Sequence, residues 1–196
     1  MMSKATKDVF IEKTLQTVAE VGMENLRTKM VADAAGFSEA TMFRFFPDKD
    51  KMLCDTFLEV DRRVSEAFLK SFETKALAEH SVADVMHEVW FKMYAYLLSH
   101  REETLYLIRF RYSALYTDEI RIQRMAYNGA FDNAYAALVE KGGVSRETYR
   151  GFMLNYMFEM TLCFAEKIVT GRLQNSKEME NRLWEAVSAA ANVFLK

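Results

Sequence analysis

The scarcity of helix-breaking residues constrains this chain most, because its 196 residues include one proline and seven glycines. These two residue types interrupt helices and build the tight turns that join short strands. Apolar residues recur at spacings of three and four, and no strand-like alternation of useful length occurs. We therefore expect an all-α fold of about nine helices.

The N-terminal quarter reads as three helices followed by the start of a longer one. The apolar spacing predicts helices over about residues 4–21, 28–35, 39–46 and 49–72. Gly22 stands where the first would end, and Pro47 ends the third because proline disfavours helix in the residue before it. Ser38 and Asp48 are of the type that caps helix N-termini.

Five further helices are expected, over about residues 81–99, 102–116, 117–143, 145–171 and 175 to the C-terminus. Their starts are suggested by Ser81, Thr117, Ser145 and Asn175 as N-caps. No repeat or flexible linker separates them. We expect a small domain over residues 1–48 and a larger helical bundle over residues 49–196.

Residues 28–46, TKMVADAAGFSEATMFRFF, fit two short helices that cross steeply around a tight turn. Gly36 permits the left-handed backbone of such a turn, and the small Ala32 lets the second helix approach closely. Met42, with Phe45 or Phe46, would anchor the second helix in the core. The pattern suits a helix-turn-helix that inserts its second helix into the DNA major groove. A plain helical hairpin would look the same.

Charge does not by itself point to nucleic acid. The formal net charge is −2, and the chain through residue 54 carries eight basic and eight acidic side chains. A basic surface is the usual electrostatic mark of a DNA-binding protein. The case for DNA therefore depends on the local pattern.

About residues 8–54 resemble the N-terminal region of the tetracycline-repressor (TetR) family of bacterial regulators. That family has a helix ending in glycine, a short helix leading into AGVS, a recognition helix ending in a YRYF-like run, and then a lysine. This chain offers VADAAGFSEATMFRFFPDKDKML, with Gly22 and Gly36 at the matching spacing. The resemblance implies a dimeric, ligand-responsive repressor with an N-terminal three-helix DNA-binding domain and a C-terminal bundle that binds ligand and dimerises. It implies DNA contacts at Arg27, Thr28, Glu39, Ala40, Thr41, Phe43, Phe45 and Lys49.

At three of these positions the residue type is less suited to binding the DNA phosphates than the residue types that are usual in the family. Phe43 and Phe45 lack the hydroxyl that tyrosine presents to a phosphate. Glu39 brings a negative charge toward DNA, although its carboxylate could accept a hydrogen bond from a cytosine amino group. Lys49 matches the family's phosphate-binding lysine. These departures concern affinity more than fold.

The segment GFMLNYMFEMTLCFA, residues 151–165, is apolar almost all round, which predicts burial on more than one side. With the last helix it could supply a four-helix dimer interface. The alternative is that both are core helices of a monomer. The interface candidates are Met153, Met157, Met160, Phe164, Leu183, Trp184, Val187, Ala191 and Phe194.

An effector site inside the bundle is implied by the resemblance. Aromatic residues suit an apolar cavity with a few polar handles, although an aromatic stripe is also ordinary core. Glu159 would either contact a ligand or pair with an arginine such as Arg109 or Arg111. The ligand candidates are Trp90, Met93, Tyr94, Tyr112, Tyr127, Phe131, Asn155, Phe158 and Glu159.

Several other classes of protein are not expected. No stretch is long and apolar enough to span a bilayer, and the N-terminus lacks an apolar signal core. The two cysteines and three histidines show no metal-ligand spacing, and no catalytic constellation occurs. We expect a cytoplasmic, non-enzymatic homodimer without cofactor, whose partners are an operator DNA and a small-molecule effector. The alternative is a helical small-molecule-binding or interaction protein with a weakened helix-turn-helix.

Overall fold

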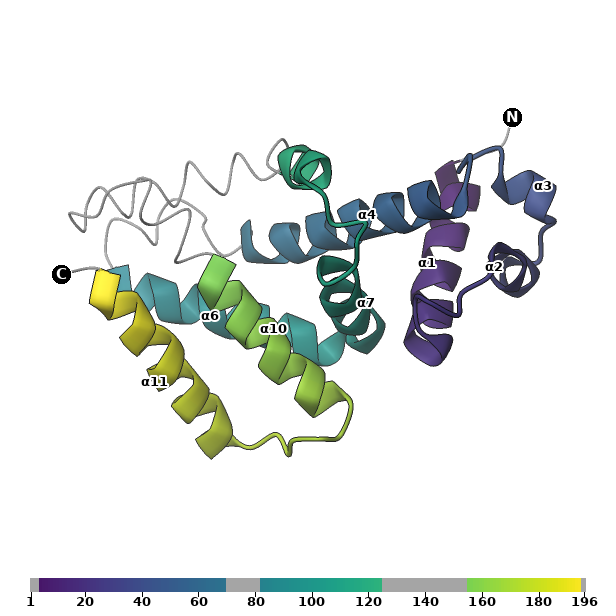
Figure 1. The fold of residues 1–196 in the computed structure, drawn as a ribbon. Helices are drawn as coiled ribbons and strands as arrows, with labels where there is room; N and C mark the ends of the chain where they lie inside the picture. The colour runs from purple at the N-terminus through teal and green to yellow at the C-terminus, as the bar shows by residue number, and fades with distance from the viewer. Residues whose placement is uncertain (1–3, 70–81, 125–154, 195–196) are drawn as a thin grey trace. The chain divides into compact units, whose positions relative to one another are not determined.

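A computed structural model describes residues 4–69, 82–124 and 155–194, and all regular structure in these ranges is helical (Figure 1). The predicted all-α fold is confirmed. The helices are α1 (Lys4–Val21), α2 (Thr28–Ala35), α3 (Glu39–Met42), α4 (Lys49–Leu69), α6 (Val82–Ser99), α7 (Arg101–Arg111), α10 (Asn155–Val169) and α11 (Lys177–Phe194). Residues 118–124 are helical as well.

The chain divides into two compact units. The first comprises Met1–Arg62 and Glu102–Arg124, and the second comprises Arg63–Arg101 and Met125–Lys196. The division falls inside α4, so this one helix belongs to both units. The predicted functional division into residues 1–48 and 49–196 stays a prediction.

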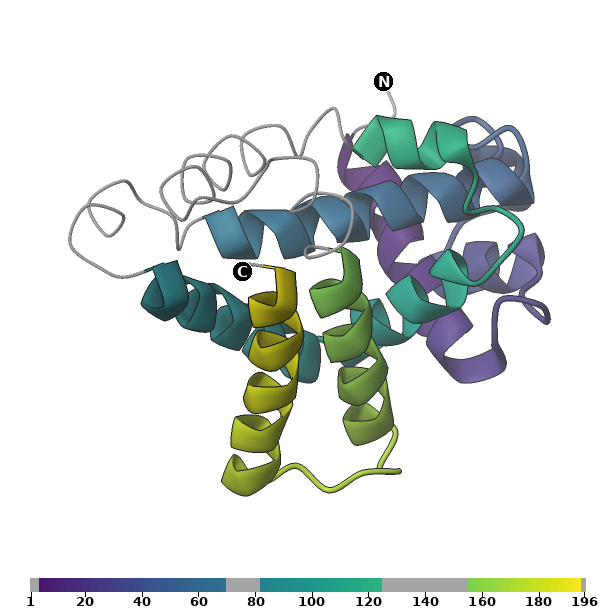
Figure 2. The ribbon, with the colours of Figure 1, turned by 60° about the vertical axis from the view of Figure 1, so that its left-hand side comes forward.

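The first unit has its core where α1, α2 and the start of α4 supply large apolar side chains. Phe10, Val31, Met42, Phe46 and Met52 are fully buried there. α1 contacts α2, and α2 contacts α3 (Figure 2). The side chains buried in this core are therefore ones that the spacing of apolar residues predicted to face inward.

Two helices are shorter than predicted. α3 ends at Met42, and the chain leaves it through turns in which Phe45 N–H bonds to the Met42 carbonyl at 2.9 Å. α7 ends at Arg111 because Ser113 competes for the backbone: its Oγ donates to the Phe110 carbonyl at 2.8 Å. Short polar side chains of this kind offer the backbone an alternative to helix.

The second unit contains α6, α10 and α11. α10 contacts both of the others, and the loop over residues 170–176 returns the chain so that α11 runs antiparallel to α10 (Figure 2). α11 is capped by Ser176, whose Oγ accepts from Met179 N–H at 3.1 Å. The predicted cap, Asn175, is therefore wrong by one residue, since its Oδ1 instead accepts from the Tyr94 hydroxyl at 3.2 Å.

The remaining predicted boundaries agree where they are described. α6 ends at Ser99 as expected, and Thr117 Oγ1 accepts from Ile120 N–H at 3.5 Å. Ser81 and Ser145 lie outside the described residues. None of the described helices combines the length and apolar character that a bilayer crossing requires.

Candidate nucleic-acid interface

The turn between α2 and α3 is built on a left-handed residue. Gly36 has φ +73°, and the next residue, Phe37, donates its N–H to the Ala32 carbonyl at 3.0 Å. A Cβ at Gly36 would meet no atom within 4 Å. Glycine is therefore required by backbone conformation and not by crowding. The predicted role of Gly36 is confirmed.

The first turn of α3 is closed by its own hydroxyl groups. Ser38 Oγ accepts from Thr41 N–H at 3.2 Å, which confirms the predicted N-cap. The same oxygen lies 3.0 Å from Thr41 Oγ1. The two hydroxyls are thus engaged with each other at the start of α3.

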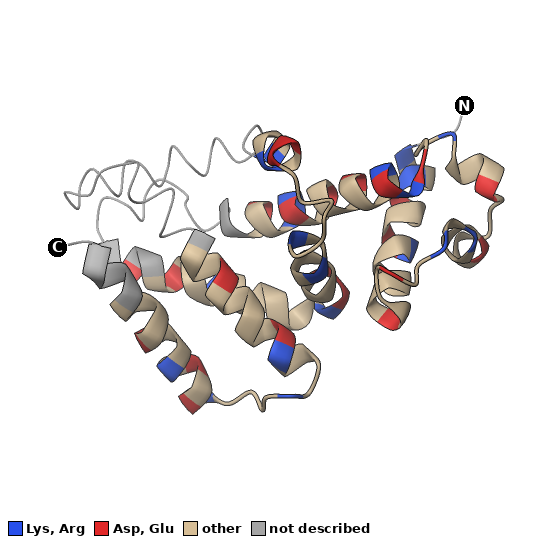
Figure 3. Ribbon diagram, viewed as in Figure 1, with Lys and Arg blue, Asp and Glu red and all other residues tan. Residues whose placement is uncertain are grey.

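A side-chain hydrogen bond joins the starts of α2 and α3. Thr28 Oγ1 donates to Glu39 Oε1 at 2.6 Å. Both side chains are half-buried. Glu39 is the one charged residue of α3, which carries red but no blue in Figure 3. Its carboxylate therefore has a structural partner within the helix-turn-helix.

The exposed side chains of this segment include two apolar ones at and just after α3, and Arg44 is exposed beside them. Ala40 is exposed, and Phe43, three residues later, keeps 43% of its surface exposed. Phe45 is half-buried, with its ring centroid 5.9 Å from that of Phe10. Of the two alternatives for the inner anchor, Phe46 is the fully buried one. Phe43 thus faces outward, whereas Phe45 packs against α1.

Arg27 precedes α2 and is exposed, without a side-chain capping bond. Lys49, at the start of α4, is half-buried and donates its Nζ to the Met23 carbonyl at 3.3 Å. Lys49 therefore ties α4 to the loop after α1. Asp48 caps α4 as predicted, because its Oδ1 accepts from Lys51 N–H at 2.7 Å.

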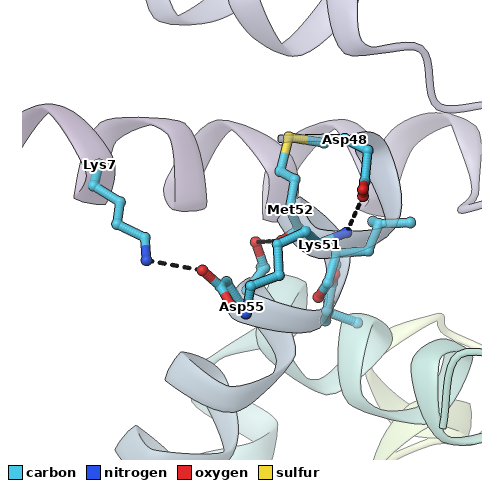
Figure 4. A network of polar contacts seen from close by, with 8 residues as sticks. Lys7, Asp48, Lys51, Met52 and Asp55 are labelled. Carbon is cyan, nitrogen blue, oxygen red and sulfur yellow. Dashed lines mark hydrogen bonds and ion pairs between the residues drawn. The ribbon is translucent and has the colours of Figure 1, made fainter. Parts of the chain in front are cut away.

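Two lysines, Lys7 and Lys51, pair with Asp55 (Figure 4). Asp55 accepts from Lys7 Nζ at 2.8 Å and from Lys51 Nζ at 2.6 Å. Burial by itself favours the neutral acid, but the hydrogen bonds from Lys51 and Lys7 outweigh it and lower the pKa of Asp55. The same contact raises the pKa of Lys51. This ion-pair cluster links α1 to α4.

Sequence reasoning missed a buried polar network that supports α4 from α7 and residues 118–124. Tyr106 donates its hydroxyl to the Leu53 carbonyl at 2.7 Å, and burial raises the pKa of this phenol well above its ordinary value. Asp61, 2% exposed, accepts from Arg124 Nε at 2.8 Å. Arg124 also donates to the Tyr116 hydroxyl at 2.9 Å. The available signal was a carboxylate, Asp61, within the apolar stripe of a predicted helix.

The structure places the ligand candidates in different environments. Trp90 and Tyr94 are buried in the second unit with ring centroids 5.2 Å apart, and Trp90 Nε1 donates to Thr161 Oγ1 at 3.0 Å. Tyr112 belongs to the first unit and is 72% exposed. Of the other candidates, Met93 is buried, and Phe158 and Glu159 are half-buried. The remaining three, Tyr127, Phe131 and the Asn155 side chain, lie outside the described residues. Their ligand roles stay predictions.

The dimer candidates also separate by burial. Met157, Leu183 and Val187 are already covered within one chain. The half-buried candidates are Met160, Phe164 and Trp184. Met153 and the side chains of Ala191 and Phe194 lie outside the described residues. The interface stays a prediction.

Both cysteines, Cys54 and Cys163, are free thiols. Within the described ranges, no group of three or more histidine, cysteine, aspartate or glutamate side chains is placed to hold a metal ion.

A left-handed glycine turn between two short helices, with the second presenting an outer face, defines the helix-turn-helix of DNA-binding transcription regulators. Residues 10–54 match the family described as bacterial regulatory proteins, tetR family. The match covers the N-terminal region, which is therefore similar to the DNA-binding domain of the TetR family.

Solved structures of TetR-family regulators share the fold. A regulator from Marinobacter aquaeolei VT8 has a TM-score of 0.74 and 23% identity over 93% of each chain. One from Shewanella sp. PV-4 has a TM-score of 0.72 and 19% identity, covering 94% of this chain and 95% of that one. FadR from Bacillus subtilis in complex with stearoyl-CoA has a TM-score of 0.60 and 16% identity, covering 96% and 97%. No curated protein sequence matches the chain.

Proposed function

We propose that this chain is a ligand-responsive repressor that binds a palindromic operator as a homodimer. The observation that carries the proposal is the ordered helix-turn-helix, in which the Gly36 turn and the Ser38 cap fix α3 with its outer face exposed. The proposed DNA contacts are those inferred from the resemblance: Arg27, Thr28, Glu39, Ala40, Thr41, Phe43, Phe45 and Lys49. No residue is assigned a catalytic role, and we place the protein in the cytoplasm with its DNA.

Two of these contacts have a bracing role in the free protein. The Glu39 carboxylate is bonded to Thr28, and the Lys49 ammonium to the Met23 carbonyl. Exposed Arg27 has no such capping bond. We therefore propose Arg27 as the main electrostatic contact to the phosphate backbone, with Glu39 acting by holding α2 and α3 together. Phosphate contacts of this kind position a protein on the duplex, whereas base contacts give specificity.

A dimer would present two copies of α3 to two half-sites. Successive major grooves on one face of B-DNA lie about 34–36 Å apart, so an operator palindrome would reflect the two-fold symmetry of the protein. We propose that α10 and α11 form the interface, as an alternative to their being core helices of a monomer. Half-buried Met160, Phe164 and Trp184 are the side chains that support it.

The effector is proposed to bind in the helical bundle. The fold shared with FadR, which was solved in complex with stearoyl-CoA, supports a small-molecule ligand for this chain. Because α4 belongs to both compact units, a ligand that alters its course in the second would act on the helix-turn-helix in the first. Such coupling between ligand and DNA is reciprocal and typically amounts to about 1–3 kcal/mol.

The proposal is tested by selecting genomic DNA fragments with the purified chain at moderate salt and sequencing them. We expect one short palindrome to be enriched, with an affinity that falls steeply as salt rises. Arg27→Ala should lower the slope of log affinity against log salt by about one per contact. Arg121→Ala, at an exposed position in residues 118–124, is the matched control. A folded protein that enriches no sequence would contradict the proposal.

The second candidate is a helical ligand-binding or interaction protein with a weakened helix-turn-helix. It is favoured by the absence of basic residues from α3 and by the balance of charge through residue 54. DNA affinity that is unaffected by Arg27→Ala and Lys49→Ala would support this candidate. The same fragment selection therefore separates the two.

A further inference from the structure

The outer face of the recognition helix carries a ridge of two apolar side chains, Ala40 and Phe43. They lie three residues apart, so they share one face of the helix and the turn that follows it. Ala40 is exposed and Phe43 is 43% exposed. An exposed phenylalanine is unusual on a surface proposed to bind DNA, so we asked which part of a base pair the Phe43 ring could contact.

The polar groups that flank this ridge have partners within the protein. Glu39 Oε1 accepts from Thr28, and Ser38 Oγ lies in hydrogen-bonding distance of Thr41 Oγ1. Guanine and adenine are usually recognised in the major groove by bidentate hydrogen bonds from arginine, lysine, asparagine or glutamine. α3, with the sequence Glu39–Met42, contains none of these. Arg44, which follows Phe43, is exposed as well, so one arginine borders the ridge, while the ridge itself is apolar.

The geometry points to thymine as the base that this surface reads. The C5-methyl group of a thymine in each operator half-site packs against the Phe43 ring, and the small Ala40 lets the helix come close enough for that contact. Thymine is the base that presents a methyl group in the major groove, and apolar side chains recognise it by contact. This assignment rests on the proposed DNA-binding function and names Phe43 as the specificity-determining residue.

The test replaces thymine by deoxyuridine in the selected operator, one symmetric position at a time. This change removes the methyl group and leaves every Watson–Crick hydrogen bond in place. We expect one position at which affinity falls about fourfold when one half-site is changed, and roughly fifteenfold when both are, as for one buried methyl group per half-site. Because the protein is unaltered, a folding defect cannot produce this result.

A variant series then assigns the methyl contact to its residue. With Phe43→Ala, the thymine and deoxyuridine operators should bind equally, whereas Phe43→Leu should keep part of the discrimination. Ile122→Ala, at a position that is 67% exposed outside the helix-turn-helix, should keep all of it. Circular dichroism and thermal unfolding would accompany each variant.

The outcomes separate this inference from the function on which it rests. Salt-dependent binding of a palindrome with no sensitivity to deoxyuridine would overturn thymine reading and leave the regulator intact. Sensitivity that persists in Phe43→Ala would overturn the role of Phe43. Failure to enrich any palindrome would overturn the proposed function itself. If Phe43→Ala binds DNA normally but loses a protein partner, the ridge is a protein-docking surface and the inference is wrong.

Discussion

Thr28 Oγ1 donates a 2.6 Å hydrogen bond to Glu39 Oε1, which joins the first residue of α2 to the first residue of α3. The bond gives a physical reason for an acidic residue at the start of the recognition helix of a DNA-binding protein. The Glu39 carboxylate links α3 to α2, and its negative charge accepts a hydrogen bond from a residue of the same helix-turn-helix. Because the bond is made to Oε1, a direct contact of Glu39 with cytosine would use the remaining acceptor capacity of the carboxylate.

Glu39→Ala should lower the free energy of unfolding by about 1 kcal/mol, because it removes a hydrogen bond to a charged acceptor. It should also weaken binding equally across operator variants. Glu39→Gln is the matched control, since its amide oxygen can still accept from Thr28. Urea unfolding and binding to single-base operator variants measure both effects. A change of preference at one base pair, with unchanged stability, would instead show that Glu39 reads a base.

The Asp61–Arg124 pair should be important for stability because its carboxylate is almost fully buried. Asp61→Ala leaves the partly buried Arg124 guanidinium without that partner. Breaking a fully buried pair typically costs about 3–5 kcal/mol, and we expect a loss at or below the lower end of that range. Asp118→Ala is the control, since its pair with Arg121 is exposed on both sides and exposed pairs contribute about 0–1 kcal/mol. Thermal unfolding of the two variants should differ clearly. Equal losses would contradict a structural role for the buried pair.

Gly36→Ala should destabilise the first unit, because alanine is strained at φ +73°. The left-handed conformation costs an L-residue roughly 1–2 kcal/mol. Gly36→Asn should cost less, since asparagine tolerates this region better than alanine. Urea unfolding of the full chain measures the difference. If alanine and asparagine are equally tolerated, backbone conformation is not what requires glycine here.

The Asp55 cluster predicts a pH-dependent contribution to stability. The pKa of Asp55 in the folded chain lies below its ordinary value of 3.8, so its ion pairs stabilise the fold above that pH. The contribution is lost as the pH falls through the lowered pKa. Asp55→Asn should cost about 0.5–1 kcal/mol at neutral pH, since both lysines are partly exposed. Urea unfolding at neutral and acid pH tests this, and a penalty that is constant with pH would contradict it.

The sequence predicted the helix-turn-helix closely because its determinants are local. The ends of α1 and α2, the left-handed Gly36, and the caps at Ser38 and Asp48 each depend on residues within four positions of one another. Caps and glycine turns act through backbone hydrogen bonds that the neighbouring side chains complete or block. The failures, at the ends of α3 and α7 and at the cap of α11, also lie at helix termini, which sequence patterns specify least well. At α7 and α11 the hydroxyl groups of Ser113 and Ser176 bond to the backbone.

The roles of the individual site residues could not be read in the same way. The sequence marks Thr28, Glu39 and Lys49 as polar residues near DNA, but only the tertiary structure brings Thr28 to Glu39 and Lys49 to the Met23 carbonyl. The tertiary structure also packs Phe45 against Phe10, whereas Phe43 remains exposed. These outcomes depend on how helices cross, which periodicity does not specify.

The sequence by itself determined an all-helical chain with a helix-turn-helix near its N-terminus, because apolar spacing, caps and glycine turns are short-range effects. The tertiary structure decided which polar groups are engaged within the protein and which side chains remain exposed. Partners such as Asp61 and Arg124 lie 63 positions apart, so their pairing depends on the packing of whole helices and the burial that packing imposes.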